Sequence, residues 1–389
     1  MANALYTCCL VISAVVALAE ICSKAQRAGL SCQQHEVQTA DGYQLSMQRI
    51  PPPLNASCES QLLPFVLMHG LIGSGADYLV GASALALRLH ANCFDVWLPN
   101  ARGSTASQRH RDMRASDSAF WRFSFHEIGV YDLPAILEHV LQVTGQQQLH
   151  YVGHSQGTTV LLVLLSQFPS YNARIASANL LAPVAYLQHM SSAPLLLLAN
   201  QAAAVQLLLE RLGLFELLSA RDVTKLGGRR FCGHASSTFA LCMLLTSLYV
   251  GFSEYPLDRH IFASILETTP ASMSRDQLLH FGQLISSGKF QHFDYQSASL
   301  NSRYYGQATP PAYNLQNVRI KVQLFYGQHD ALTSRKDVQR LAQELRNCRV
   351  ELYEVLGYNH IDFLFSPTAA QILYEGLIQR AKAIRTNPT

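Results

Sequence analysis

Short apolar runs, each closed by a turn signal, recur along the chain. Six of them cover residues 65–70, 94–100, 149–155, 177–184, 322–330 and 350–357. Runs of this length, bounded by Gly, Pro and Asn, are typical of strands buried on both faces of a parallel sheet. Stretches with a helical period lie between them, such as residues 125–145. This alternation predicts an α/β fold with right-handed crossovers.

The pattern changes over residues 185–310. Helices are predicted at 195–213, 239–252 and 275–288, and no clear strand interrupts them. We interpret 185–310 as a helical cap or lid inserted between the two halves of one sheet, within a core made of 20–184 and 311–389. The cap is unusually apolar. Its faces can pack on each other and on the core, or they can offer a hydrophobic surface to a lipid substrate or interface.

The first nineteen residues carry no charged side chain, and the apolar stretch 10–19 ends in small residues. This pattern is typical of a secretory signal peptide, residues 1–19, cleaved near Ala19; a buried helix is the alternative. The stretch is too short to span a bilayer comfortably. The other uncharged stretch, 190–209, contains Pro194, Asn200 and Gln201, so no transmembrane segment is predicted.

Net charge and cysteine content bear on the partners that the protein can have and on its disulfides. The formal net charge is +3 and no run of Lys or Arg suits nucleic acid, so no nucleic-acid partner is expected. Cleavage near Ala19 leaves seven cysteines, an odd number, so at least one is free or paired with another chain. No Cys or His cluster has metal-ligand spacing, and no metal site is predicted. Asn55 begins the sequon Asn-Ala-Ser beside a Pro-rich stretch, and we expect it to be glycosylated.

One serine stands in the pattern G-x-S-x-G. Ser155 lies between Gly153 and Gly157, after the predicted strand 149–155 and before an apolar helical stretch. In this setting the pattern predicts a nucleophile elbow, where a sharp turn requires small neighbours of the serine. The positive end of the following helix favours negative charge near the hydroxyl. A tight turn that happens to contain a serine is the alternative.

A serine nucleophile needs a base, and the base needs an acid to orient it. In proteins with a nucleophile elbow, the three residues follow one another along the chain in the order Ser, then Asp or Glu, then His. Asp330 and His360 follow the predicted strands 322–330 and 350–357, so both would lie at the sheet edge that carries Ser155. We therefore predict that His360 takes the proton of Ser155, while Asp330 fixes the tautomer of His360.

Other titratable residues near these positions are expected to point elsewhere. His329 and Asp362 adjoin the chosen pair, and His292 and Asp294 fall in the cap. His154 flanks the serine, but its backbone direction carries its side chain away from the attack site. We interpret all of them as structural.

An oxyanion hole needs two backbone N–H groups aimed at one oxygen. One comes from the residue after the nucleophile, here Gln156, and the other from the loop after an earlier strand. The segment 68–75 has glycines at 70, 73 and 75, which let the backbone approach closely. Leu71 is the predicted second donor.

The chain resembles the animal acid lipases, which include the gastric and lysosomal acid lipases, from about His35 to the last helix. The resemblance lies in strings such as HEVQTADGYQLSMQRIP, LMHGLIGSGADYL, FWRFSFHEIGVYDLPA, VGHSQGTT and YNHIDF. It implies the α/β-hydrolase fold with a helical cap and lid, no cofactor, and hydrolysis of neutral lipid esters in a secreted or lysosomal setting. It also implies a disulfide between Cys232 and Cys242.

The chain departs from the family pattern near the predicted site. Ala101, Ser104 and Ala106 stand where the family usually has Ser, Asn and Trp, and Cys93 stands where it tends to have Gly. The stretch 251–257 looks shortened. These differences bear on pocket shape and lipid preference.

The sequence thus predicts a serine lipase that hydrolyses triglycerides and cholesteryl esters through an acyl-enzyme on Ser155 at a lipid–water interface. A carboxylesterase for smaller soluble esters is one alternative, and a non-catalytic lipid-binding protein of the same fold is another. An epoxide or haloalkane hydrolase is disfavoured, because its nucleophile is an aspartate where this chain has Ser155. The sequence leaves the protein partners and the oligomeric state undetermined.

Overall fold

The computed structural model describes residues 21–53, 58, 62–218 and 228–384. The predicted signal peptide, 1–19, and the predicted glycosylation site, Asn55, lie outside the described residues.

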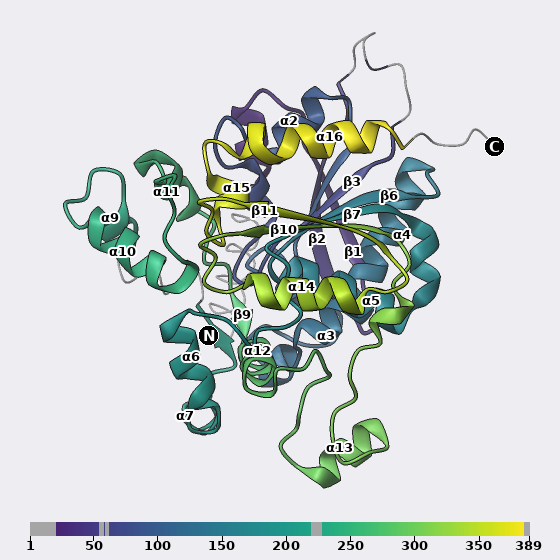
Figure 1. Ribbon diagram of the computed structural model, residues 1–389, viewed down its shortest axis with the longest axis vertical. Coiled ribbons are helices and arrows are strands. Elements are labelled where there is room, and N and C mark those ends of the chain that lie inside the picture. The colour runs from purple at the N-terminus through teal and green to yellow at the C-terminus, as the bar shows by residue number, and fades with distance from the viewer. Residues whose placement is uncertain (1–20, 54–57, 59–61, 219–227, 385–389) are drawn as a thin grey trace, which may run out of the picture.

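A single large sheet forms the centre of the molecule (Figure 1). Its strand order is β1-β2-β4-β3-β6-β7-β10-β11, with β5 paired to β2. Six neighbouring strands run parallel: β4, β3, β6, β7, β10 and β11. The strands β1, β2 and β5 form an antiparallel edge. The bounds are β1 Gln33–Gln38, β2 Tyr43–Ile50, β3 Phe65–Met68, β4 Val96–Pro99, β5 Arg109–His110, β6 Leu149–His154, β7 Ile175–Leu181, β10 Lys321–Gly327 and β11 Arg349–Val355.

Each of the six predicted strands is present, which confirms the α/β class. All six residues of β6 are buried, because β3 and β7 flank it and helices cover both of its faces. The antiparallel edge was not predicted. β1 alternates between exposed and half-buried positions, so it lacks the continuous apolar run that marks the inner strands.

Helices cover both faces of the sheet (Figure 1). One apolar cluster joins the sheet to α2, η1, α15, η6, α16 and the helical segment 21–27, and a second joins its other face to α3, α4, α5 and α14. The bounds are η1 Gly75–Leu79, α2 Leu85–Ala91, η2 Ser118–Trp121, α3 Phe125–Glu127, η3 Ile128–Asp132, α4 Leu133–Thr144, α5 Gln156–Gln167, η4 Pro169–Arg174, η5 Leu315–Asn317, α14 Arg335–Glu344, α15 Asp362–Phe365, η6 Ala370–Tyr374 and α16 Glu375–Lys382.

The segment 185–310, which we call the cap, is mostly helical and lies to one side of the sheet (Figure 1). The predicted helix 195–213 is two helices, bent by 76° at Gln201. The expectation of no strand is wrong in detail, because β8 and β9 form a two-residue antiparallel pair. The bounds are α6 Ala193–Asn200, α7 Ala202–Arg211, β8 Glu216–Leu217, α9 Gly228–Cys232, α10 Phe239–Val250, α11 Arg259–Ile265, β9 Met273–Ser274, α12 Arg275–Ser287 and α13 Ala298–Tyr305.

In the described part of the chain, no single helix has the length and apolar character that crossing a membrane requires. The bent pair α6–α7 meets the test when its two helices are taken together, by length and composition only.

Contacts distant in sequence fasten the cap to the core. Lys24, in the segment 21–27, is buried and donates to the Ser264 hydroxyl at 3.0 Å while pairing with Glu267. The N–H of Ala271 donates to the carbonyl of Ile72, in the loop after β3, at 2.6 Å. The cap is therefore held against both the first described helix and the predicted oxyanion loop.

Six cysteines form three disulfides in the described residues. The structure joins Cys232 to Cys242 within the cap, and it also joins Cys22 to Cys32 and Cys58 to Cys93. Cys93 adopts φ 69°, a left-handed conformation that favours glycine, the residue found there in the resembled family. Cys348 is the free thiol that the odd count requires, and it is half-buried.

Candidate active site

The turn that carries Ser155 is sharp and strained. Ser155 joins the end of β6 to the first residue of α5 with φ 53° and ψ −120°. A Cβ on Gly153 would lie 2.6 Å from the carbonyl of Gly157, and one on Gly157 would lie 2.3 Å from the carbonyl oxygen of Met68. Backbone stands where those side chains would be, so both positions require glycine.

Ser155, His360 and Asp330 form one hydrogen-bonded series. The His360 Nε2 atom lies 2.8 Å from the Ser155 hydroxyl, and its Nδ1 atom lies 2.9 and 3.1 Å from the two carboxylate oxygens of Asp330. Because a carboxylate accepts, Nδ1 carries the proton and Nε2 is free to accept from the hydroxyl. The structure brings together the three residues that the sequence singled out.

The Asp330 carboxylate is almost fully buried and held by its own loop. Its Oδ1 atom accepts the N–H of Leu332 at 2.8 Å and the N–H of Thr333 at 2.9 Å, and its Oδ2 atom accepts the Thr333 hydroxyl. These donors fix the direction from which the carboxylate meets His360, so the imidazole has one orientation to adopt.

The two predicted oxyanion donors come from separate segments, Gln156 directly after Ser155 and Leu71 in the loop after β3. Gln156 is the first residue of α5, and the first N–H groups of a helix have no acceptor within the helix. The loop after β3 comes so close that a Cβ on Gly70 would lie 3.1 Å from the Ser155 Cβ. Leu71 lines the same cavity as Ser155. The Gln156 side chain accepts from Gln277 of α12 at 2.9 Å, so the cap holds this residue in place.

His69 supports the predicted oxyanion loop, a role that sequence reasoning missed. Its Nδ1–H donates to the carbonyl of Gly70 at 2.8 Å, and its Nε2 accepts the N–H of Ala101 at 3.0 Å. Burial lowers its pKa to about 4, which keeps the ring neutral so that Nε2 can accept. The signal in the sequence is a histidine between the β3 strand and the glycine of the loop.

Two of the titratable residues that we interpreted as structural have partners outside the predicted site, and a third, His154, contacts His360. His329 pairs with Glu254, and Asp362 accepts the backbone N–H of Asn359. The Nε2 atom of His154 lies 2.8 Å from the carbonyl oxygen of His360, and the two imidazole rings have centroids 5.1 Å apart.

The two remaining cap residues are also accounted for. His292 stacks on Tyr313 with ring centroids 4.4 Å apart, and Asp294 accepts from Asn301. Neither lines the cavity that contains Ser155.

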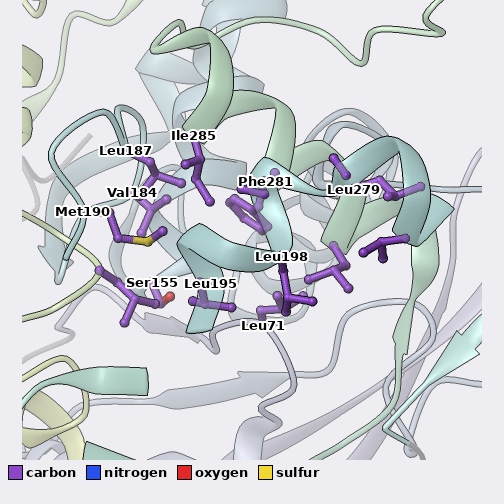
Figure 2. A pocket seen from close by; sticks show the side chains of 16 residues that line it. Leu71, Ser155, Val184, Leu187, Met190, Leu195, Leu198, Leu279, Phe281 and Ile285 are labelled. Carbon is purple, nitrogen blue, oxygen red and sulfur yellow. The ribbon is translucent and has the colours of Figure 1, made fainter. Parts of the chain in front are cut away.

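Ser155 opens into an apolar cavity beneath the cap (Figure 2). The cavity encloses about 750 Å³, part of it open to solvent, and Ser155 is the one polar residue in its lining. The other lining residues come from the oxyanion loop, the loops after β7 and β10, and helices α6, α7 and α12: Leu71, Val184, Leu187, Met190, Leu195, Leu198, Ala199, Ala202, Val205, Leu278, Leu279, Phe281, Gly282, Ile285 and Leu332. Such a lining suits a long hydrocarbon chain whose reactive end lies at the serine.

The departures at Ala101, Ser104 and Ala106 lie outside this lining. All three are buried, and the Ser104 hydroxyl donates to the carbonyl of Ala101. Ala101 contacts His69, which supports the predicted oxyanion loop, and Ser104 contacts Ala101. Within the described ranges, no group of three or more His, Cys, Asp or Glu side chains is placed to hold a metal ion.

Fold and site together define an α/β hydrolase with a serine, histidine and aspartate in hydrogen-bonding contact. A family model for the alpha/beta hydrolase fold matches residues 64–218, and one for a partial alpha/beta-hydrolase lipase region matches 21–82. Among solved structures, a monoglyceride lipase of Saccharomyces cerevisiae is 15% identical over 92% of this chain and 96% of its own, with a TM-score of 0.57. A carboxylesterase of Bacillus subtilis is 12% identical over 95% and 97%, with a TM-score of 0.51. These two structures show the fold.

Closer relatives identify the family. "Lipase 3" of Drosophila melanogaster is 36% identical over 91% of both chains. The gastric triacylglycerol lipase of Rattus norvegicus is 36% identical over 90% of this chain and 88% of its own, and the human lysosomal acid lipase/cholesteryl ester hydrolase is 33% identical over 90% and 87%. The chain belongs to the family of the gastric and lysosomal acid lipases. It is a carboxylic ester hydrolase, and its three disulfides fit an extracellular or lysosomal protein.

Proposed function

We propose that the protein hydrolyses ester bonds of neutral lipids, triglycerides and cholesteryl esters, through an acyl-enzyme on Ser155. The observation that carries the proposal is the contact of His360 with both the Ser155 hydroxyl and the Asp330 carboxylate, at the mouth of an apolar cavity. Names of relatives such as gastric triacylglycerol lipase and cholesteryl ester hydrolase support this substrate class.

The residues divide the reaction between them. Ser155 Oγ forms a bond to the ester carbonyl carbon while His360 Nε2 takes the hydroxyl proton. The carbonyl oxygen becomes an oxyanion and accepts from the N–H groups of Leu71 and Gln156. The C–O bond to the alcohol then breaks, and His360 gives its proton to the departing oxygen. A water molecule, deprotonated by His360, then attacks the acyl carbon; the bond from this carbon to Ser155 Oγ breaks, His360 returns the proton to Oγ, and the fatty acid is released.

The lining of the cavity determines which acyl groups the site favours. Each methylene that moves from water into an apolar cavity gains about 0.8 kcal/mol, so a lining of Leu, Val, Ile, Met and Phe favours long chains over short ones. A small soluble ester would use little of this surface. The cavity therefore favours a lipase over a carboxylesterase for small esters, and the assembled series of Ser155, His360 and Asp330 disfavours a non-catalytic binder.

We propose that the segment 185–310 acts as the cap and contacts the lipid–water interface. Helices α6, α7, α9 and α10 of the cap lie at the periphery of the molecule (Figure 1). Large apolar side chains are more than a third exposed on α6, α7, α9, α10 and their ends: Leu197, Leu198, Leu207, Leu208, Leu212, Phe231, Leu241, Leu244, Leu245, Leu248, Tyr249 and Phe252. Exposed apolar surface of this extent marks an interaction site, and a lipid surface is the partner that the reaction supplies.

Replacement of Ser155 tests the reaction. The Ser155→Ala variant should lose hydrolysis of emulsified triolein and labelling by a fluorophosphonate, while its melting temperature stays near that of the parent. Labelling of the parent at Ser155, located by mass spectrometry of the labelled peptide, would exclude the non-catalytic binder. Triolein hydrolysis by the Ser155→Ala variant within a few-fold of the parent would sink the proposal.

The interface is tested separately by paired surface variants. Leu241 and Leu245 lie half-exposed on α10, whereas Leu352 and Ile372 are similarly exposed on the core. Replacing the α10 pair with Gln should lower the rate on emulsified triolein about tenfold and leave the rate on a soluble ester unchanged. Replacing the core pair with Gln should change neither. Equal loss from both pairs would argue against the cap as the interface.

We also propose cleavage after Ala19 and a glycan on Asn55. N-terminal sequencing of the secreted protein should begin at residue 20. Treatment with an N-glycosidase should lower the mass of the parent but not that of an Asn55→Gln variant. An intact mass that retains residues 1–19, or that shows no glycan, would contradict the respective proposal.

A further inference from the structure

The last residue of α10 contacts both loops that carry the proposed catalytic acid and base. The Val250 carbonyl accepts the backbone N–H of His360 at 3.1 Å and the N–H of Ala331 at 3.3 Å. Asp330 directly precedes Ala331 in the chain. The final carbonyls of a helix have no partner within the helix. Here that partner is the main chain of the two catalytic loops.

The next residue completes the attachment. The Gly251 carbonyl accepts the Asn359 side-chain amide at 3.0 Å, and Asn359 directly precedes His360. Gly251 has φ 97°, and a Cβ there would lie 1.9 Å from the carbonyl oxygen of His329 and 3.0 Å from the N–H nitrogen of Ala331. The turn therefore touches the residues on both sides of Asp330.

A single turn of the cap thus contacts two loops that come from neighbouring strands. Asp330 follows β10 and His360 follows β11, and the two loops also contact each other, because the His329 N–H donates to the Tyr358 carbonyl at 2.9 Å. The turn adds a third partner to this contact. Because one carbonyl accepts from both loops, a shift of either loop breaks a hydrogen bond. The same two hydrogen bonds to the Val250 carbonyl help to fix the distance between Asp330 and His360.

We propose that the turn Val250–Gly251 is a positioning element that holds His360 and Asp330 in register from the cap. The inference rests on the proposed catalytic roles of these two residues. It makes the cap part of the catalytic apparatus even for substrates that involve no lipid surface. The chemistry on a small soluble ester should depend on this turn as much as the chemistry on a lipid.

A pair of glycine variants tests the inference. Gly251 ends α10 and Gly213 follows α7; both have positive φ, 97° and 63°, but a Cβ on Gly213 would meet nothing within 4 Å. Alanine strains the backbone at both positions, and more at Gly251, whose ψ of 164° lies in a region almost exclusive to glycine; only at Gly251 does it also push the catalytic loops. On a soluble short-chain ester, Gly251→Ala should lower kcat at least about tenfold with KM unchanged, whereas Gly213→Ala should keep both.

A second variant covers the case in which Gly251→Ala does not fold. In Asn359→Asp, the Oδ1 atom that accepts from Ile361 and Asp362 is retained, but the donor to the Gly251 carbonyl is lost. We expect slower labelling of Ser155 by a fluorophosphonate, measured on the plateau of the pH profile so that the added charge does not account for the change. An unlabelled parent would overturn the proposed function itself. The inference alone would be overturned if the parent is labelled and if Asn359→Asp, and Gly251→Ala where it folds, are labelled as fast as the parent.

Discussion

The Nε2 atom of His154 donates a hydrogen bond to the carbonyl oxygen of His360 over 2.8 Å. The residue before the proposed nucleophile therefore holds the main chain of the proposed base. Burial, and secondarily the charge of His360, lowers the pKa of His154 to about 3, so its ring is neutral at neutral and mildly acidic pH. His154 thus holds the carbonyl of His360, whereas Val250 holds its N–H.

Loss of this donor should slow the reaction without weakening substrate binding. We expect His154→Met, which fills the space without donating, to lower kcat on a soluble ester about tenfold at unchanged KM, because a small misplacement of His360 is costly. His154→Gln, whose amide can donate, should recover part of the rate. Equal rates in both variants would show that the histidine only fills space.

Asp330→Asn should remove most of the catalytic rate and leave the fold intact. The amide oxygen can still accept from Leu332 and Thr333, but the amide N–H₂ would face His360 Nδ1 and favour the wrong tautomer. In serine hydrolases of this arrangement the loss in kcat is on the order of 10⁴-fold. Asp294→Asn in the cap is the matched control and should retain activity. Steady-state kinetics on a soluble ester measure both, and a loss below about tenfold would contradict the role of Asp330.

A bulkier side chain in the cavity should change the preferred acyl length. Gly282 of α12 lines the cavity, and a Cβ there has only the Ala199 Cα at 4.0 Å. We expect Gly282→Leu to lower hydrolysis of oleoyl esters more than about tenfold while butyryl esters react as in the parent, with Gly282→Ala intermediate. Rates measured across a series of chain lengths check this order. A uniform loss at every length would point to damage of the site instead.

Buried histidines between the cap and the core should make stability fall in acid. Burial lowers the pKa of His126 to about 4, of His280 to about 3 and of His292 to about 4. From the ordinary value of 6.5 down to these values the unfolded chain binds protons that the native state does not. The free energy of unfolding should therefore decrease as the pH falls from 6.5 to about 4. Melting temperatures measured across this range test the direction.

His292→Phe isolates one of these groups. A phenyl ring can keep the stacking on Tyr313 but cannot titrate. The variant should therefore lose less stability than the parent between pH 6.5 and 4. Asp77, whose pKa is raised to about 6 by burial, acts in the opposite direction in both proteins and cancels in the comparison. Parallel curves for variant and parent would contradict the assignment to His292.

The fold and the three central residues could be predicted because they depend on local signals. Buried parallel strands are continuous apolar runs, and Ser155 and Asp330 follow two of them, β6 and β10. His360 follows β11, which was predicted as another buried strand but is a partly exposed strand at the edge of the sheet. The contacts that hold these residues could not be predicted. The bonds from His154 and Val250 to His360 join segments distant in sequence, and one uses only main-chain atoms, whose pattern no residue type records.

Cysteine pairing and helix length could not be predicted from the sequence either. The spacing of seven cysteines does not determine which of them meet, so Cys58 and Cys93 became a pair only in three dimensions. The apolar stretch 195–213 has no proline at its centre, and yet the chain bends by 76° at Gln201 so that α6 and α7 can both line the cavity.

The attachment of Lys24 to Ser264 and Glu267 has a consequence for biosynthesis. In a chain made from its N-terminus, residue 24 emerges some 240 residues before its partners. The junction must therefore assemble late, after a long loop has closed. Until then the first described helix, residues 21–27, has an unpaired ammonium group and an apolar face without its full cover, the state of the nascent chain that chaperones of the secretory pathway would encounter.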